Sequence, residues 1–111
     1  MMPIEKRLEM YKNKKLFVDS ISKVFEIKSL QSNVTKIEYE VLTKQINEDV
    51  TAYYEFVIVT LTSGSKCIRS VSGTSNNGIF QELGKLINGG YYDEVDYYNS
   101  FFDNGFTKLE L

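Results

Sequence analysis

The chain of 111 residues contains no histidine, one cysteine, one proline and no tryptophan. Without histidine it lacks the commonest general base and the imidazole ligands of most zinc sites. The single cysteine, Cys67, builds neither a disulfide framework nor a thiolate metal cluster, and as a nucleophile it would lack its usual imidazole partner. These absences argue against an enzyme and predict a protein without a cofactor or a bound metal.

Long apolar runs are also missing. None approaches the ~20 residues that span a bilayer, and the first 15 residues lack the continuous apolar segment of a secretory leader. The composition, with 42% hydrophobic and 25% charged residues, is that of an ordinary globular chain. No linker or repeat divides it, so we expect a single domain, residues 1–111, and the scarcity of cysteine favours the cytoplasm.

The hydrophobic period is first helical and then strand-like. Residues 3–15 predict a short helix with Ile4, Leu8 and Tyr11 on one stripe, whereas residues 16–23 fit a helix or a strand. Period-two patterns and turn signals then predict four strands, which in sequence order form an antiparallel meander: 24–30, 34–44, 52–62 and 66–72. The third of these is apolar on both faces, which is typical of a central strand.

A helical period returns after residue 78. The predicted stripe ends at Asn88-Gly89-Gly90, a helix stop, and consists of Ile79, Phe80, Leu83, Leu86 and Ile87. A final helix is expected to begin at Asp93, whose side chain would cap the backbone N–H of Asp96, and to end at Asn104-Gly105. Residues 107–111 favour a short edge strand. The predicted fold class is α+β: an N-terminal helix, a four-stranded antiparallel sheet and two C-terminal helices.

Three sequence features deserve comparison with catalytic or binding motifs. Glu38 and Glu40 share a strand face, as a catalytic carboxylate pair does, but Lys36 and Lys44 on that face favour a solvated ladder of ion pairs. The loop at 73–78 has the spacing GxxxxG but is not followed by the Lys and Ser/Thr of a phosphate-binding loop. Cys67 lies in a strand pattern, as a small buried residue does. None of the three predicts a catalytic site.

Charge is distributed unevenly along the chain. The first 16 residues hold a basic cluster, which on a helix could grip phosphates: Lys6, Arg7, Lys12, Lys14 and Lys15. Glu5 and Glu9 interrupt this cluster, so a solvated helix face is the simpler interpretation. At the other end, no Lys or Arg occurs between Lys85 and Lys108.

The final helix has two distinct faces. One is an apolar stripe expected to pack on the sheet: Tyr91, Val95, Tyr98, Phe101 and Phe102. The other carries acids around a tyrosine, and tyrosine among carboxylates is a common anchor for a basic protein partner. We take as candidate partner-binding residues Asp93, Glu94, Asp96, Tyr97, Ser100 and Asp103.

The segments "FQELGKLINGG", "YYDEVDYYNSFF" and "TKLEL" occur in this order within residues 80–111. The stretch resembles the C-terminal part of small phage-encoded type II-A anti-CRISPR proteins, in which a short apolar helix, an acidic–aromatic tract and a similar tail follow one another. The resemblance implies an inhibitor that blocks the DNA-recognition groove of an RNA-guided CRISPR nuclease in a bacterial host. It implies contacts from Asp93, Glu94 and Asp96 to that basic groove.

The sequence therefore predicts a small cytoplasmic protein from a phage or mobile element that binds a host protein stoichiometrically through an acidic C-terminal helix. One alternative is a nucleic-acid-binding accessory protein that uses the basic first helix. A second alternative is a structural or assembly protein that associates through the sheet surface near "AYYEFVIV". The oligomeric state stays open.

Overall fold

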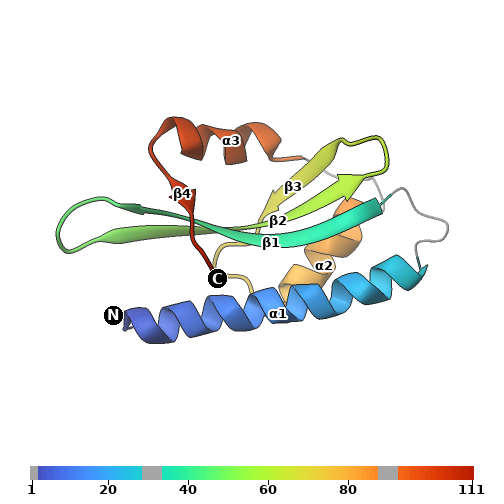
Figure 1. Cartoon of the computed structure of the whole chain (residues 1–111), viewed down its shortest axis with the longest axis horizontal. Helices are drawn as coiled ribbons and strands as arrows, with labels where there is room; N and C mark the ends of the chain where they lie inside the picture. The colour runs from blue at the N-terminus through green and yellow to red at the C-terminus, as the bar shows by residue number, and fades with distance from the viewer. Residues whose placement is uncertain (1–2, 29–33, 88–92) are drawn as a thin grey trace.

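The protein is an α+β sandwich of three layers, seen in a computed structural model that describes residues 3–28, 34–87 and 93–111, with side chains left out for 25–28. Helices α1 and α2 cover one face of an antiparallel sheet and α3 covers the other (Figure 1). The strand order is β3-β2-β1-β4. The elements are α1 (Ile4–Lys28), β1 (Val34–Gln45), β2 (Thr51–Leu61), β3 (Lys66–Ser70), α2 (Asn76–Ile87), α3 (Val95–Asp103) and β4 (Thr107–Lys108). The predicted fold class is confirmed.

The first helix is longer than predicted. It continues through residues 24–28, so the prediction of a strand beginning at 24 is wrong. The buried stripe runs on from Tyr11 through Val18 at helical spacing, and no glycine or proline follows Pro3 until Gly64. Ile4, expected in the core, is 60% exposed. The turn signal Gln-Ser-Asn at 31–33, between the first two predicted strands, lies outside the described residues.

The fourth strand comes from the end of the chain instead. β4 pairs with β1 through Leu42 and Lys108, and the Leu109 N–H donates to the Val41 carbonyl at 2.8 Å. The predicted short strand at 107–111 is therefore confirmed, and it supplies the fourth strand. Only β1, β2 and β3 form the expected meander, and β2 is the central strand that its apolar pattern predicted.

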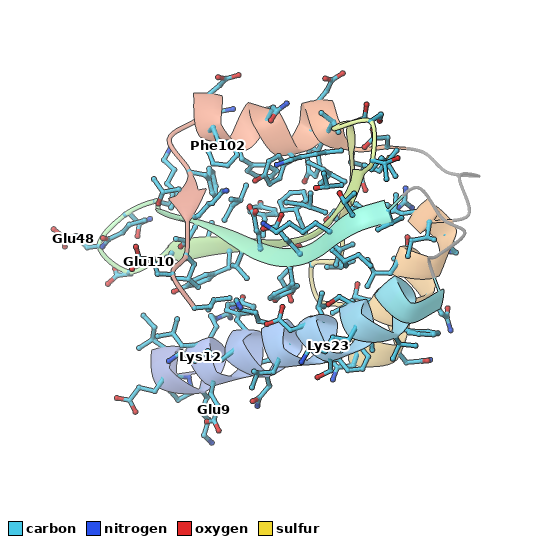
Figure 2. All side chains as sticks on the ribbon, turned by 45° about the vertical axis from the view of Figure 1, so that its right-hand side comes forward. Glu9, Lys12, Lys23, Glu48, Phe102 and Glu110 are labelled. Atoms are coloured by element: carbon cyan, nitrogen blue, oxygen red, sulfur yellow. The ribbon has the colours of Figure 1, made fainter. Side chains whose placement is uncertain are left out.

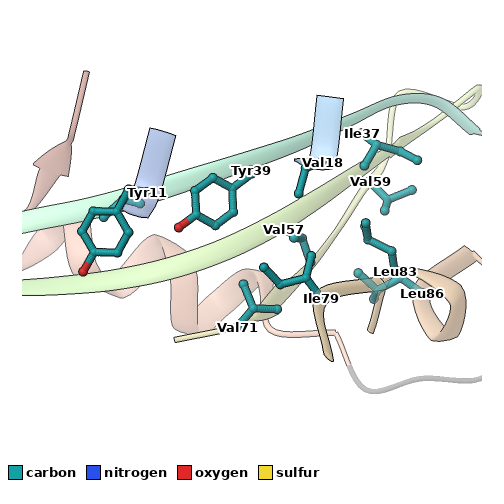
Figure 3. Close-up of a cluster of buried hydrophobic side chains, with 11 residues drawn as sticks. Tyr11, Val18, Ile37, Tyr39, Val57, Val59, Val71, Ile79, Leu83 and Leu86 are labelled. Atoms are coloured by element: carbon teal, nitrogen blue, oxygen red, sulfur yellow. The ribbon is translucent and has the colours of Figure 1, made fainter. Parts of the chain in front are cut away.

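Two apolar cores lie on opposite faces of the sheet. Alternation along β1 and β2 places Ile37, Tyr39 and Val57 toward the α1 and α2 layer, where they meet Val18 and Leu83 (Figure 3). The second core, beneath α3, consists of Leu42, Phe56, Ile58, Ile68 and Tyr98. None of the described helices has the length and hydropathy to cross a membrane.

Candidate functional site

Helix α3 is anchored by aromatic packing against β2. Phe56, which is fully buried, lies with its ring centroid 5.2 Å from that of Tyr98 and 5.6 Å from that of Phe101. Edge-to-face pairs of this kind add about 0.5–1.5 kcal/mol each beyond their buried area. Tyr98 and Phe101 therefore occupy the core, as predicted. Phe102, predicted for the same stripe, is 39% exposed because it lies at the flank of the helix.

The outer face of α3 is an exposed ridge. We call it the α3 crest and define it by residues at helical spacing that point away from the sheet: Asp96, Asn99, Ser100 and Asp103. An aromatic ring stands on each side of the ridge, Tyr97 at 44% exposure and Phe102 at 39%. Phe102 is labelled on α3 in Figure 2. The crest thus combines acids with exposed aromatic surface, the composition of a protein-binding site.

Asp93 and Glu94 do not belong to this ridge. The Asp93 carboxylate accepts hydrogen bonds from the backbone N–H of Ile68 at 2.9 Å and of Val95 at 3.2 Å. The Glu94 carboxylate accepts from the Ser70 N–H at 3.0 Å. The two side chains therefore accept the hydrogen bonds of backbone N–H groups on the outer edge of β3. Helix α3 begins at Val95, so the predicted cap from Asp93 to the Asp96 N–H is replaced by these contacts.

Asp93→Ala is expected to lower the free energy of unfolding by about 1–2 kcal/mol, because it leaves two backbone donors without their acceptor. Asp96→Ala, an exposed crest substitution of the same chemistry, should change stability by less than about 0.5 kcal/mol. Urea denaturation of both variants measures the difference. Equal stabilities would contradict a supporting role for Asp93.

The C-terminal end of α3 is closed by a glycine turn. Gly105 has φ +85°, a conformation that disfavours side chains, and it lets the Phe106 N–H reach back to the Phe101 carbonyl at 3.0 Å. The Phe106 ring packs with its centroid 5.0 Å from that of Phe101, so the chain folds back on the last turn of the helix. Lys44 donates to the Asn104 carbonyl at 2.7 Å, which complements the helix dipole.

The carboxylates of β1 lie under the flank of α3. Glu40 accepts a hydrogen bond from the Tyr98 hydroxyl at 2.5 Å and pairs with Lys108 at 3.4 Å, while Glu38 pairs with Lys36 at 3.4 Å. The predicted ion-pair ladder is thus present, with Lys108 in the place expected for Lys44. Burial of Tyr98, reinforced by its bond to Glu40, raises the pKa of the Tyr98 hydroxyl well above its usual value.

The basic residues of α1 are dispersed rather than clustered. Arg7 donates to the Tyr11 hydroxyl at 2.9 Å and stacks over the Tyr53 ring, and Lys15 pairs with Asp19 at 3.1 Å. Lys14 is buried. Only Lys6 and Lys12 of the five stand exposed on the helix. Three of the cations that a nucleic acid would need are therefore held in contacts within the protein.

Lys14 belongs to a buried polar cluster around Glu55. The Lys14 ammonium lies 2.7 Å from the Glu55 carboxylate, which also accepts from the Tyr39 hydroxyl at 2.6 Å and from the Gly73 N–H at 2.8 Å. Glu55 is 3% exposed and Lys14 8%. Burial and the adjacent Glu55 carboxylate raise the pKa of Tyr39. Every oxygen of the carboxylate has a donor, so the cluster is structural.

The remaining sequence candidates show no reactive geometry. Residues 73–75 lead into α2, which already includes 76–78, and the Gly73 N–H donates to the Glu55 carboxylate. Cys67 is half-buried in β3, and burial, with a smaller effect of Asp93, raises the pKa of its thiol. A raised thiol pKa lowers the thiolate fraction that nucleophilic chemistry needs.

Of the six predicted partner-binding residues, the structure brings Asp96, Tyr97, Ser100 and Asp103 together on α3 and places Asp93 and Glu94 against β3. The sequence prediction missed Asn99 and Phe102. Asn99 follows Asp96 by three residues, and this helical spacing could have placed it on the ridge. The exposure of Phe102, in contrast, depends on how the helix packs on the sheet, which the spacing does not give.

Searches of protein-family models, of curated proteins and of solved structures find no match to this chain.

Proposed function

We propose that the protein acts stoichiometrically, by binding a partner protein with a basic surface through the α3 crest and its flanking aromatic rings. The observation that carries this proposal is the combination of exposed Asp96 and Asp103 with half-exposed Tyr97 and Phe102 on a helix whose opposite face packs on the sheet. Charge directs such an encounter, and aromatic anchors supply much of the affinity.

In its specific form, the partner is an RNA-guided CRISPR nuclease and the protein is its inhibitor. The resemblance of residues 80–111 to type II-A anti-CRISPR proteins supports this form, as does the acidic character of the crest. The contacts proposed for Asp93 and Glu94 are withdrawn from the interface, since both side chains hold β3. The crest supplies the acids in their place.

The test is binding and DNA cleavage by a type II-A nuclease loaded with guide RNA. The variant Asp96→Lys with Asp103→Lys should weaken binding by at least about 100-fold, because two attractive charges become repulsive. The matched control reverses two exposed acids at the β1–β2 hairpin tip, Glu48→Lys with Asp49→Lys, and should bind as the wild type does. Glu48 lies at that tip, away from α3 (Figure 2).

The outcomes separate the two parts of the proposal. Equal binding by the crest variant and the wild type would remove the crest from the interface. A wild-type protein that neither binds nor inhibits the nuclease would remove the nuclease as partner. The nucleic-acid alternative is disfavoured by the dispersed cations of α1, and the assembly alternative by the two layers that cover β2.

A further inference from the structure

The two outer edges of the sheet differ in how much of each is covered by other parts of the chain. The outer edge of β3 is occupied by the Asp93 and Glu94 carboxylates, which accept from the Ile68 and Ser70 N–H groups. One half of the outer edge of β1 is occupied by β4, up to the bond from Leu109 to Val41. Edges are commonly covered because bare strands pair with other chains. The other half of β1 calls for explanation.

Along Val34–Glu40 no strand lies beside the outer edge of β1 in the described part of the chain, although Ile37 and Tyr39, as whole residues, are only 6% and 4% exposed. The Leu109 bond shows that the Val41 carbonyl points away from β2, and strand geometry alternates. The N–H and C=O groups of Ile37 and Tyr39 therefore point the same way. Within the described part of the chain, no hydrogen bond reaches them. Figure 1 shows α1 below this stretch of β1, with β4 beside the other half of the strand.

We propose that this open edge is a second binding surface, which takes an extended segment of a partner protein as an added strand. Such strand addition gains its affinity from main-chain hydrogen bonds and its specificity from alternate side chains. The segment would lie in one row with β4. Seven residues of strand, from Val34 to Glu40, span roughly 23 Å at about 3.3 Å each.

The charges of β1 define the chemistry of that segment. Lys36, with its side chain 64% exposed, and Glu38, at 31%, lie on the α3 side of the edge. An antiparallel segment fits best when it places an acid opposite Lys36 and a base opposite Glu38, because opposite charges on facing strands attract. In such a segment the acid and the base are two residues apart, with an apolar residue between them, because residues at i and i+2 of a strand lie on the same face. β1 itself has this pattern, in "KIE" at 36–38.

A second copy of the chain could supply β1 as the added strand, but it would bring its own α1 helix with it. Paired strands lie about 4.8 Å apart, whereas packed helices need about 8–10 Å between their axes. Helix α1 lies along β1, through contacts such as those of Val18 with Ile37 and Tyr39 in one core. Two copies joined edge to edge would bring their α1 helices onto the same face of one sheet, where the helices need that spacing. A segment without such a helix meets no such demand, and it is the occupant that we propose.

The probe is the peptide VTKIEYE, which copies residues 34–40 and brings the required charges without the helix. Hydrogen exchange followed by NMR should show slower exchange at the Ile37 and Tyr39 amides when peptide is added. The Glu38 and Glu40 amides face β2 and should not change. Methylation of the backbone nitrogen of the peptide's isoleucine, which faces β1, should weaken binding about tenfold. Methylation of the backbone nitrogen of its lysine, which faces away from β1, should have little effect.

The register is tested by exchanging charges. In the variant Lys36→Glu with Glu38→Lys, the peptide should bind at least about fivefold more weakly, and the peptide VTEIKYE should restore binding. The crest variant Asp96→Lys with Asp103→Lys should bind the peptide normally, so this result is independent of the proposed function. No protection of Ile37 and Tyr39 at millimolar peptide would overturn the proposal. A dimer that protects these amides without peptide would also overturn it.

Discussion

Glu55→Ala is expected to lower the free energy of unfolding by about 3–5 kcal/mol, the range found when one member of a buried ion pair is removed. The substitution leaves the Lys14 ammonium in a buried position, 8% exposed, with its carboxylate partner gone. It also removes the acceptor of the Tyr39 hydroxyl and of the Gly73 N–H. Urea denaturation monitored by circular dichroism measures the loss.

A second substitution identifies the cause. If the unpaired charge dominates, adding Lys14→Met to Glu55→Ala should recover at least about 1–2 kcal/mol, although the double variant has lost more polar contacts. Purely additive losses would show that packing around Glu55 matters more than its charge. A cost below about 1 kcal/mol for Glu55→Ala alone would contradict the assigned role of the cluster.

Alkaline pH is expected to unfold the protein steeply. Burial and neighbouring carboxylates raise the pKa of Tyr39 and Tyr98 in the folded state. A group with a raised folded pKa stabilises fully below its unfolded pKa, about 10 for tyrosine, and loses that contribution as the pH rises toward the folded pKa. Above pH 10, unfolded tyrosines lose protons that the folded ones keep. Stability should therefore fall by about 1.4 kcal/mol per pH unit for each of the two.

The Tyr98→Phe variant isolates one of these contributions. Its stability should fall less steeply than that of the wild type between about pH 10 and pH 12, by about 1.4 kcal/mol per pH unit. Below pH 9 the two proteins should show the same pH dependence, because Tyr98 is then protonated in both the folded and the unfolded state. Unfolding measured in urea across this range compares the slopes. Identical slopes above pH 10 would contradict the raised pKa of Tyr98.

Periodicity predicted most of the fold because it reports burial directly. The alternation of β1 and the two-sided apolar pattern of β2 were interpreted correctly. The prediction for α1 was a helix over 3–15, with 16–23 left open and a strand from 24, whereas the helix runs to Lys28. Its buried stripe includes a charged residue, Lys14, which interrupts the apolar period. Its partner, Glu55, lies 41 residues away. A local pattern contains no information on such a partner.

In the candidate site, too, local position could be predicted from the sequence and contacts with distant residues could not. Helical spacing placed Asp96, Tyr97 and Asp103 on one exposed face, as the structure has them. Asp93 and Glu94 are acids of the same tract, but their role depends on the edge of β3, a strand 25 residues earlier for Asp93. Position on the helix was predictable from sequence, whereas contact with a distant strand was not.

Helix α3 is held at both ends, by the bond from the Glu94 N–H to the Ile68 carbonyl and by the Lys44 ammonium on Asn104. Its aromatic underside fixes the middle. A surface held in this way is already ordered before any partner arrives, so association loses little chain entropy there. Encounter should then proceed as rigid docking, at a rate set by charge and diffusion. Differences among partners will therefore appear in how long each complex lasts, rather than in how fast it forms.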